Sequence, residues 1–449
     1  MRPKQQPKAR HDDLFRARLD QIINMKHALV TLADRIDWAW LDDELAECFS
    51  DQGRPAEPVR FMVGMFLLKH TYGLSDEQVW DRWVHDPYFQ YFTGEEFFQH
   101  ELGHERSGMS HWRKRIGGKL DILLAESLRI AHEAGALKKS DLARVTIDTT
   151  VQPKNVAFPT DAKLLETAIR QLGKLARAHD VPLRQSYGRV ARRAAMMAGR
   201  YAHAQQFKRM RRQIKFLRTR LGRVIRDIRR QTADDEALQE IFAVALGRAA
   251  HGLRGQKQRQ RGRKLYSWHA PEVECIGKGK VRTPYEFGVK VSLTITNKRC
   301  KGGQFILHAK ALPGNPYDGH TLKAVIEETE ALTGREIERV YVDKGYVGHH
   351  APKPYRVYRS GQKRGVHGQI RKELRRRSAI EPVIGHCKSD GHLDRNFLHG
   401  RDGDQFNAVM SAVGYNLRLI LKWLRKLLCK IIAAIWAAIT QPSALKPAS

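Results

Sequence analysis

Cysteine pairs, long apolar runs and acidic residues are the features that this 449-residue chain has little of. Its five cysteines are widely scattered and contain no C-x-x-C pair: Cys48, Cys275, Cys300, Cys387 and Cys429. This odd number and wide spacing exclude a disulfide framework and a structural zinc site, and they fit a reducing cytoplasm.

Apolar runs long enough to cross a bilayer are also missing. The N-terminal ten residues are basic, but no apolar signal core follows them, so we do not expect secretion. Residues 417–440 are the one suspect, and cations interrupt them, including Lys422, Arg425, Lys426 and Lys430. The uncharged remainder is about half of what a bilayer needs. Leucine and isoleucine recur here at helical spacing, which predicts an amphipathic helix docked on the protein. Binding to a membrane surface is the alternative.

Acids are few relative to bases. The chain has 80 lysines and arginines against 48 aspartates and glutamates, for a net charge of +32. Such an excess attracts polyanions, so DNA is the expected partner and the nucleoid the expected place within the cytoplasm. The length predicts two or three domains.

Three of the acids stand in informative places. Asp148 and Asp343 each end an apolar, β-branched run, and Glu381 lies between Arg377 and Lys388 near the start of a predicted helix. Carboxylates on two strand ends and a helix make an oxygen-rich site of the kind that Mg²⁺ binds. Together with the charge, this pattern indicates metal-dependent phosphodiester chemistry on DNA.

Each of these acids also has an ordinary structural explanation. Asp148 and Asp343 are compatible with plain turns after a strand. Ser378-x-x-Glu381 has the spacing of a capping box, and Pro382 fits only near a helix start. Capping and metal binding need different directions of the Glu381 carboxylate, so a structure separates them.

The order of predicted elements indicates the fold class. Residues up to 143 favour helices, and a long insertion favours helices again. The remaining elements are a strand at 145–151, a hairpin of strands at 285–296 and 304–309, a helix at 319–332, a strand ending at 343, a short strand at 355–359 and the Glu381 helix. The sequence pattern does not show clearly whether a helix lies between residues 343 and 355. This α/β pattern is that of a ribonuclease H-like mixed sheet with a helical N-terminal domain and a long basic helical insertion.

The insertion contains a heptad seam on a long predicted helix: Phe207, Met210, Ile214, Leu217, Leu221, Val224 and Ile228. Arginines fill most positions between these residues. A helix with one apolar stripe needs a partner, so we expect it to pair within a helical hairpin or with another protomer. A solvated packing hairpin and a DNA-contacting arm both remain open, and the arginines favour the arm.

The N-terminal region contains three further signals. Residues 61–68 predict a buried helix, and Ser75-x-x-Gln78 predicts a capping box. Ser110 is the expected cap of one long helix that runs through Leu124. The basic run Arg113-Lys-Arg115 makes this helix a candidate for reading DNA, with a solvated basic face as the alternative.

His100-Glu-Leu-Gly-His104 satisfies the H-E-x-x-H motif of zinc proteases. Gly103 weakens a helix at this point, and Gly108 and His111 fall one residue late for the extended motif. We therefore expect a helix end or a loop here, without zinc hydrolysis.

At these residues the chain resembles the insertion-sequence DDE transposases, a bacterial group with a helical N-terminal domain ahead of a ribonuclease H-like core. The similarity runs over nearly the whole chain and includes residues 97–102, 112–116 and 267–272. The resemblance implies that Asp148, Asp343 and Glu381 are the catalytic, metal-binding triad.

The same resemblance assigns neighbours of the triad. Arg377 and Lys388 match the arginine and lysine that flank the family's glutamate, and Tyr346 matches the tyrosine after the second aspartate. All three are expected to contact DNA or its phosphates. The family has a tyrosine where this chain has Leu374.

As a function, the resemblance implies cleavage of DNA at the ends of a mobile element and strand transfer into target DNA. We expect two Mg²⁺ ions, or Mn²⁺ in their place, with Asp148 bridging them, Asp343 on one and Glu381 on the other. The expected partners are double-stranded DNA, both terminal inverted repeats and target, and a second copy in a homodimer on DNA. Two alternatives remain: a DNA-binding protein without catalysis, and a nuclease or resolvase that cuts without joining.

The expected domain boundaries follow from these patterns. Residues 1–143 are the helical DNA-binding or accessory domain, and residues 144–160 with 265–415 are the catalytic domain. Residues 161–264 are the basic insertion, and residues 416–449 are the C-terminal amphipathic helix and tail.

Overall fold

The computed structural model describes residues 17–50, 52, 56–253, 264–277, 279, 284–353 and 356–440, with only the backbone for residues 430–440. The chain divides into two compact units, residues 1–153 with 289–449 and residues 154–288. All five cysteines are free.

Eight α-helices precede the first strand in the described part of the chain: α1 (Leu19–Ile22), α2 (Ala28–Arg35), α3 (Trp38–Leu45), α4 (Val59–Tyr72), α5 (Asp76–His85), α6 (Pro87–Thr93), α7 (Gly108–Ile116) and α8 (Asp121–Glu133). The predicted buried helix is α4, whose side chains are buried on nearly all sides. The predicted capping box opens α5, where the Gln78 backbone N–H donates to Ser75 Oγ over 3.1 Å and the Ser75 N–H donates to Gln78 Oε1 over 2.8 Å.

The predicted single helix from Ser110 to Leu124 is wrong. Helix α7 ends at Ile116, a 3₁₀ turn covers Gly117–Lys119, and α8 begins at Asp121. Two adjacent glycines, Gly117 and Gly118, carry the largest entropic cost of helix formation, which explains the break. Ser110 lies inside α7 and does not cap it.

A mixed sheet lies mainly in the first unit, while its residues 274–277 and 285–288 belong to the second. Its strands are β1 (Arg144–Pro153), β2 (Glu274–Gly277), β3 (Tyr285–Thr296), β4 (Ile306–Leu312), β5 (Arg339–Val342) and β6 (Val357–Arg359). The order is β2-β3-β1-β5-β6, with β4 paired to β3. Strands β1, β5 and β6 are parallel, and the β3–β4 pair is the predicted antiparallel hairpin. This arrangement confirms the predicted ribonuclease H-like mixed sheet.

Helices follow the strands as predicted. Helix α13 (Asp318–Thr333) connects β4 to β5, and α14 (Gly368–Arg375) and α15 (Ile380–Asp390) follow β6. Between Asp343 and β6 the described residues contain no α-helix, and a 3₁₀ turn covers Lys344–Tyr346. Strand β2 was not predicted, because its four residues are too few to show a period.

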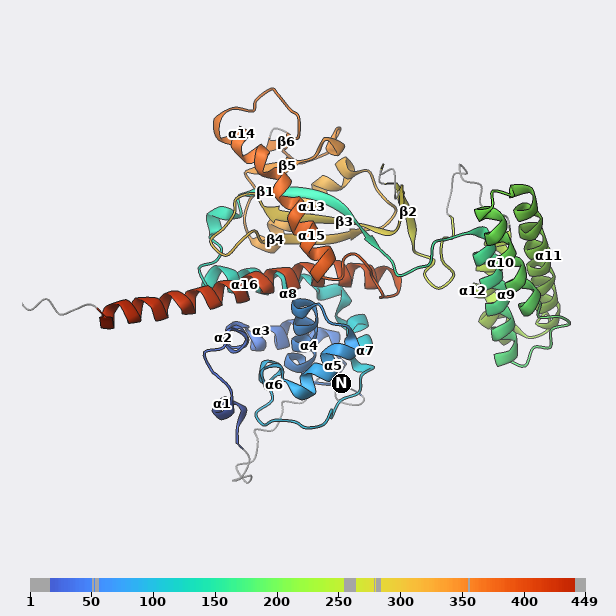
Figure 1. Ribbon diagram of the computed structural model, residues 1–449, viewed down its shortest axis with the longest axis horizontal. Helices are drawn as coiled ribbons and strands as arrows, with labels where there is room; N and C mark the ends of the chain where they lie inside the picture. Colours follow the sequence, from blue (N-terminus) through green and yellow to red (C-terminus); the bar gives the residue numbers. More distant parts are fainter. Residues whose placement is uncertain are drawn as a thin grey trace, which may run out of the picture. The chain divides into compact units, whose positions relative to one another are not determined.

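The last helix, α16 (Gly400–Thr440), packs on both parts of this unit. Figure 1 shows it between the sheet and the N-terminal helices. Leu417, Leu421 and Leu424 are at most 6% exposed, so the predicted amphipathic helix is docked in this part. Docking of its residues 430–440 stays a prediction, because their side chains lie outside the described part of the chain. Gly414 lies against the His70 carbonyl of α4, where a Cβ atom would collide. In the described residues, no helix is long and apolar enough to cross a membrane.

The second unit contains four helices: α9 (Asp161–Ala178), α10 (Gly188–His203), α11 (Phe207–Gln231) and α12 (Glu236–Leu253). They pack around their own apolar core (Figure 1), to which the predicted seam of α11 contributes. Leu217, Leu221 and Ile228 are fully buried, whereas Phe207 at the start of the seam is 52% exposed. The seam therefore pairs within the insertion, in a four-helix bundle instead of a hairpin.

Candidate active site

Two of the three predicted acids meet because of the strand register. The parallel pair β1–β5 aligns Arg144 with Arg339 and Thr146 with Tyr341. Continuing this register places Asp148 opposite Asp343, on neighbouring strands and on the same face of the sheet. Figure 1 shows β1 and β5 side by side with α15 next to them.

The Arg377 guanidinium connects both aspartates to the third acid. Its Nη1 atom lies 3.3 Å from Asp148 Oδ2, and its Nη2 atom lies 3.8 Å from Asp343 Oδ1 and 3.6 Å from Glu381 Oε1. The three predicted triad members, 148, 343 and 381, are thus gathered around one cation.

Glu381 does not form the capping box that was the alternative to this arrangement. Helix α15 has Ala379 at its N-cap position with no side-chain cap, and Ser378 Oγ donates to the Arg375 carbonyl instead. The Glu381 carboxylate points toward Arg377. The capping explanation of Glu381 is therefore wrong.

Exposure increases across the site. The Asp148 side chain is 20% exposed and that of Arg377 is 14% exposed, whereas those of Asp343 and Glu381 are 49% and 66% exposed. Burial, with a smaller contribution from the nearby charges of Asp343 and Asp318, raises the pKa of Asp148 to about 6. The Thr149 backbone N–H, which donates to Asp148 Oδ1 over 2.8 Å, and Arg377 act in the opposite direction.

The donor set fits a hard divalent cation. Carboxylate oxygens are the ligands that Mg²⁺ and Mn²⁺ prefer. Burial, the main cause of the raised pKa of Asp148, disfavours its charged form, which a bound cation would stabilise. Among the described residues, however, no three acids, histidines or cysteines are close enough to hold a metal ion as they stand, because the triad carboxylates surround Arg377. Metal binding by the triad requires these side chains to close in and Arg377 to move aside.

Two of the predicted DNA contacts lie at different depths. Lys388 is half-buried on α15, seven residues after Glu381 and therefore on the same helix face. Tyr346 is only 1% exposed, and its ring lies beneath the acids. Burial and the charges of Asp148, Asp318 and Asp343 raise the pKa of Tyr346 well above its usual value. A contact between Tyr346 and DNA would need this ring to become exposed.

Sequence reasoning missed a fourth acid beside the triad. Thr149 Oγ1 donates to Asp318 Oδ1 over 3.1 Å, and Lys290 Nζ lies 3.0 Å from the same oxygen. Lys290 also donates to the Pro316 carbonyl over 2.7 Å. Asp318 is the first residue of α13, where an acid is ordinarily explained by the helix dipole, so its position alone gave no signal.

A basic pocket of about 660 Å³ adjoins the triad. Arg377 lines it together with Arg371, Arg375 and Lys363, and Leu374 lies on its wall. Leu374 is the position at which the family pattern has tyrosine. The pocket therefore offers cations next to the acids.

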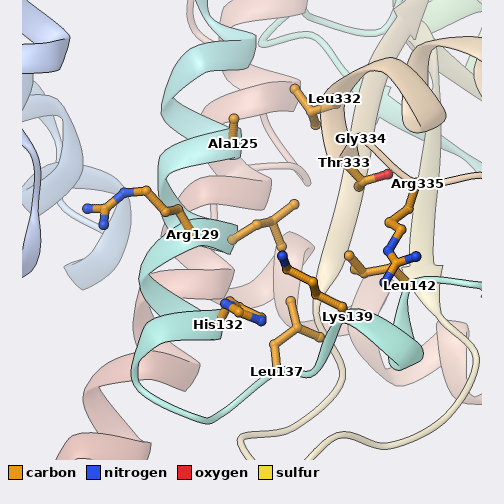
Figure 2. A pocket seen from close by; sticks show the side chains of 11 residues that line it. Ala125, Arg129, His132, Leu137, Lys139, Leu142, Leu332, Thr333, Gly334 and Arg335 are labelled. Atoms are coloured by element: carbon orange, nitrogen blue, oxygen red, sulfur yellow. The ribbon is translucent and has the colours of Figure 1, made fainter.

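A second pocket, of about 620 Å³, lies elsewhere in the first unit. Figure 2 shows Arg129 and His132 on α8 at one side and Thr333 and Arg335 at the other. Arg129 is held by Glu126 and Glu133, and none of the lining residues belongs to the triad.

The remaining sequence candidates have structural roles in the described residues. The segment from His100 to His104 is irregular backbone, as predicted, and His104 Nδ1 lies 2.6 Å from Glu57 Oε2. Arg113 of the candidate DNA-reading helix is buried against Asp76 and the Phe66 ring, whereas Lys114 and Arg115 are exposed.

Comparison with known families identifies two regions of the chain. Residues 17–115 match a model described as "Transposase domain (DUF772)". Residues 250–417 match a model described as "Transposase DDE domain", which includes Asp343 and Glu381 but not Asp148. The chain belongs to the DDE transposases, whose members carry out transposition, bind DNA and typically use divalent metal ions.

One curated relative is 50% identical over 208 residues, which make up 46% of this chain and the whole of that protein. It is described as "Uncharacterized protein ORF8 in nfe locus" of Rhizobium meliloti. No solved structure matches the chain.

Proposed function

We propose that this transposase cleaves DNA at the ends of its element and joins the freed ends to target DNA, with Asp148, Asp343 and Glu381 as its catalytic acids. The observation that carries the proposal is the approach of all three carboxylates, from β1, the end of β5 and α15, to within 4.0 Å of one guanidinium. Three independent elements converge on one point that is open to solvent at Asp343 and Glu381.

Asp148, Asp343 and Glu381 would hold Mg²⁺, or Mn²⁺ in its place, which supplies an acidified water or DNA hydroxyl as nucleophile and stabilises the leaving oxygen. Arg377 and Lys388 would neutralise charge on the reacting phosphate. Hydrolysis and strand transfer differ only in the nucleophile, so one site serves both. The transfer exchanges like bonds and requires no ATP.

Access for DNA supports the same conclusion. Glu381 is 66% exposed, so a phosphodiester can reach the acids without opening of the fold. The adjoining pocket presents Arg371, Arg375 and Lys363 to the strand next to the scissile phosphate. Its size admits part of a nucleotide chain.

Nicking of a labelled duplex that carries the element's ends tests the catalytic assignment. Asp343→Asn should reduce Mg²⁺- or Mn²⁺-dependent nicking by at least about 1,000-fold, because it removes a ligand needed in the transition state, while DNA binding persists. Asp394→Asn, the same change at an exposed acid of the same unit, should nick like the wild type. Equal nicking by Asp343→Asn and the wild type would refute the assignment.

The products separate this function from its two alternatives. Joined products from labelled ends and target DNA are expected for a transposase. Nicking without joining would indicate a nuclease or resolvase, and DNA binding without nicking would indicate a non-catalytic binder. The proposal includes two copies acting on paired ends, so the complex with end DNA should have the mass of a dimer.

A further inference from the structure

The second unit concentrates its positive charge on two of its four helices. Helices α10 and α11 together carry 15 lysines and arginines and a single acid, Asp227. Asp227 is itself buried, pairs with Arg230 and accepts a hydrogen bond from the Arg184 backbone N–H. Nearly all of this positive charge is therefore uncompensated within the two helices.

On α11 the cations follow a straight line. The face opposite the buried seam carries residues at spacings of three or four, all of them exposed: Lys208, Arg212, Lys215, Thr219, Arg223, Arg226 and Arg230. Six of these seven residues are cations, all except Thr219. We call these six cations the α11 stripe. At 1.5 Å per residue the stripe is about 33 Å long.

Most of the α11 stripe has no partner in the protein. Lys208, Arg212, Lys215 and Arg226 make no ion pair and no side-chain hydrogen bond to any residue that the structure describes. Like charges at this spacing destabilise a helix. A bound polyanion removes this repulsion.

We propose that the α11 stripe is a DNA-binding surface, separate from the triad, that takes the phosphate backbone of about one turn of duplex DNA without reading its sequence. Its length matches the pitch of the duplex, about 34 Å. Arginine and lysine are the side chains suited to phosphate oxygens. A membrane fits this face less well, because the apolar side of α11 is buried in the bundle and is not available for insertion.

The test measures the salt dependence of binding to a duplex of arbitrary sequence and about three helical turns, in EDTA so that no cleavage occurs. The stripe variant is Arg212→Gln/Lys215→Gln/Arg226→Gln in the full chain. The matched control is Arg170→Gln/Lys174→Gln/Arg177→Gln, which removes three exposed cations from α9 of the same unit. All six positions are exposed, so both variants should keep the wild-type circular dichroism and melting temperature.

Each phosphate contact contributes about 0.9 to the slope of log affinity against log salt, so the stripe variant should lose about 3 from this slope and roughly 100-fold in affinity at about 0.1 M salt. The α9 control should lose much less of both the salt slope and the affinity. Wild-type slope and affinity in the stripe variant, or equal losses in both variants, would overturn the proposal. The assay contains no free metal ion and measures binding alone, so its outcome does not depend on the catalytic assignment.

Discussion

Asp318 is connected to the triad acid Asp148 through Thr149. It accepts a hydrogen bond from the Thr149 hydroxyl, and the Thr149 backbone N–H in turn donates to Asp148. Lys290 neutralises Asp318 from the neighbouring strand β3. This chain of contacts fixes the direction of the Asp148 carboxylate.

Asp318→Asn should therefore lower nicking by roughly 10- to 100-fold and raise the Mg²⁺ concentration needed for half-maximal rate, as losses behind metal ligands do. Binding of DNA should be unchanged. Glu327→Gln, the same kind of change on the exposed side of α13, serves as the control. An Asp318→Asn enzyme with the wild-type metal dependence would show that Asp318 does not position the site.

Some residues of the candidate site could be predicted from the sequence, and others could not. Asp148 and Asp343 were predictable as candidates because each ends a β-branched run. Asp343 directly follows β5, but Asp148 lies in the middle of β1, which continues to Pro153, so the prediction that Asp148 ends a strand is wrong. The bridging role of Arg377 was not predictable, because it depends on the placement of α15 relative to the strands. Asp318 was hidden because acids are common in the first turn of any helix.

At the scale of elements, an ion-pair cluster attaches α13 to the sheet. Glu328 of α13 lies 3.2 Å from His308 Nε2 and also pairs with Lys310, both on β4. The hydrogen bond from His308, followed by that from Lys310, lowers the pKa of Glu328 from 4.5 to about 2. Stability from this depressed pKa is fully present above about pH 4.5 and is lost as the pH falls toward 2.

Glu328→Gln should reduce the free energy of unfolding by about 1–2 kcal/mol at neutral pH, less than the full pKa shift implies because the Glu328 side chain is 38% exposed and screened by solvent. Urea denaturation at several pH values measures this. The difference from the wild type should shrink below about pH 4.5. A difference as large at pH 3 as at neutral pH would contradict the ionic origin.

Elements with a strong period were predicted well, and those without one were not. Strand β3 has the predicted bounds, Tyr285 to Thr296, because apolar residues occupy every second position from Tyr285 to Ile295. Strand β2 has only four residues. Apolar residues recur at helical spacing all the way from Ser110 to Leu124, so this pattern predicted one helix. The pattern does not include the entropic cost of fixing Gly117 and Gly118 in a helix, which explains the observed break.

At the scale of the whole molecule, the two family matches leave residues 116–249 unassigned. That stretch holds Asp148 and nearly all of the α9–α12 bundle, so the structure describes parts of the chain that the matches do not cover. The net charge predicted a polyanionic partner, and the seam predicted a packed α11. The alignment of six α11 cations along one exposed face became visible only once the exposed residues of the helix were known.

The central claim is that Asp148, Asp343 and Glu381 form one metal-binding site. Calorimetric titration of Mn²⁺ into the full chain tests this claim most directly. Asp148→Asn, Asp343→Asn and Glu381→Gln should each weaken Mn²⁺ binding by at least about tenfold, because each removes a charged oxygen ligand. Asp394→Asn should bind like the wild type. Wild-type Mn²⁺ binding in all three single variants would contradict the account.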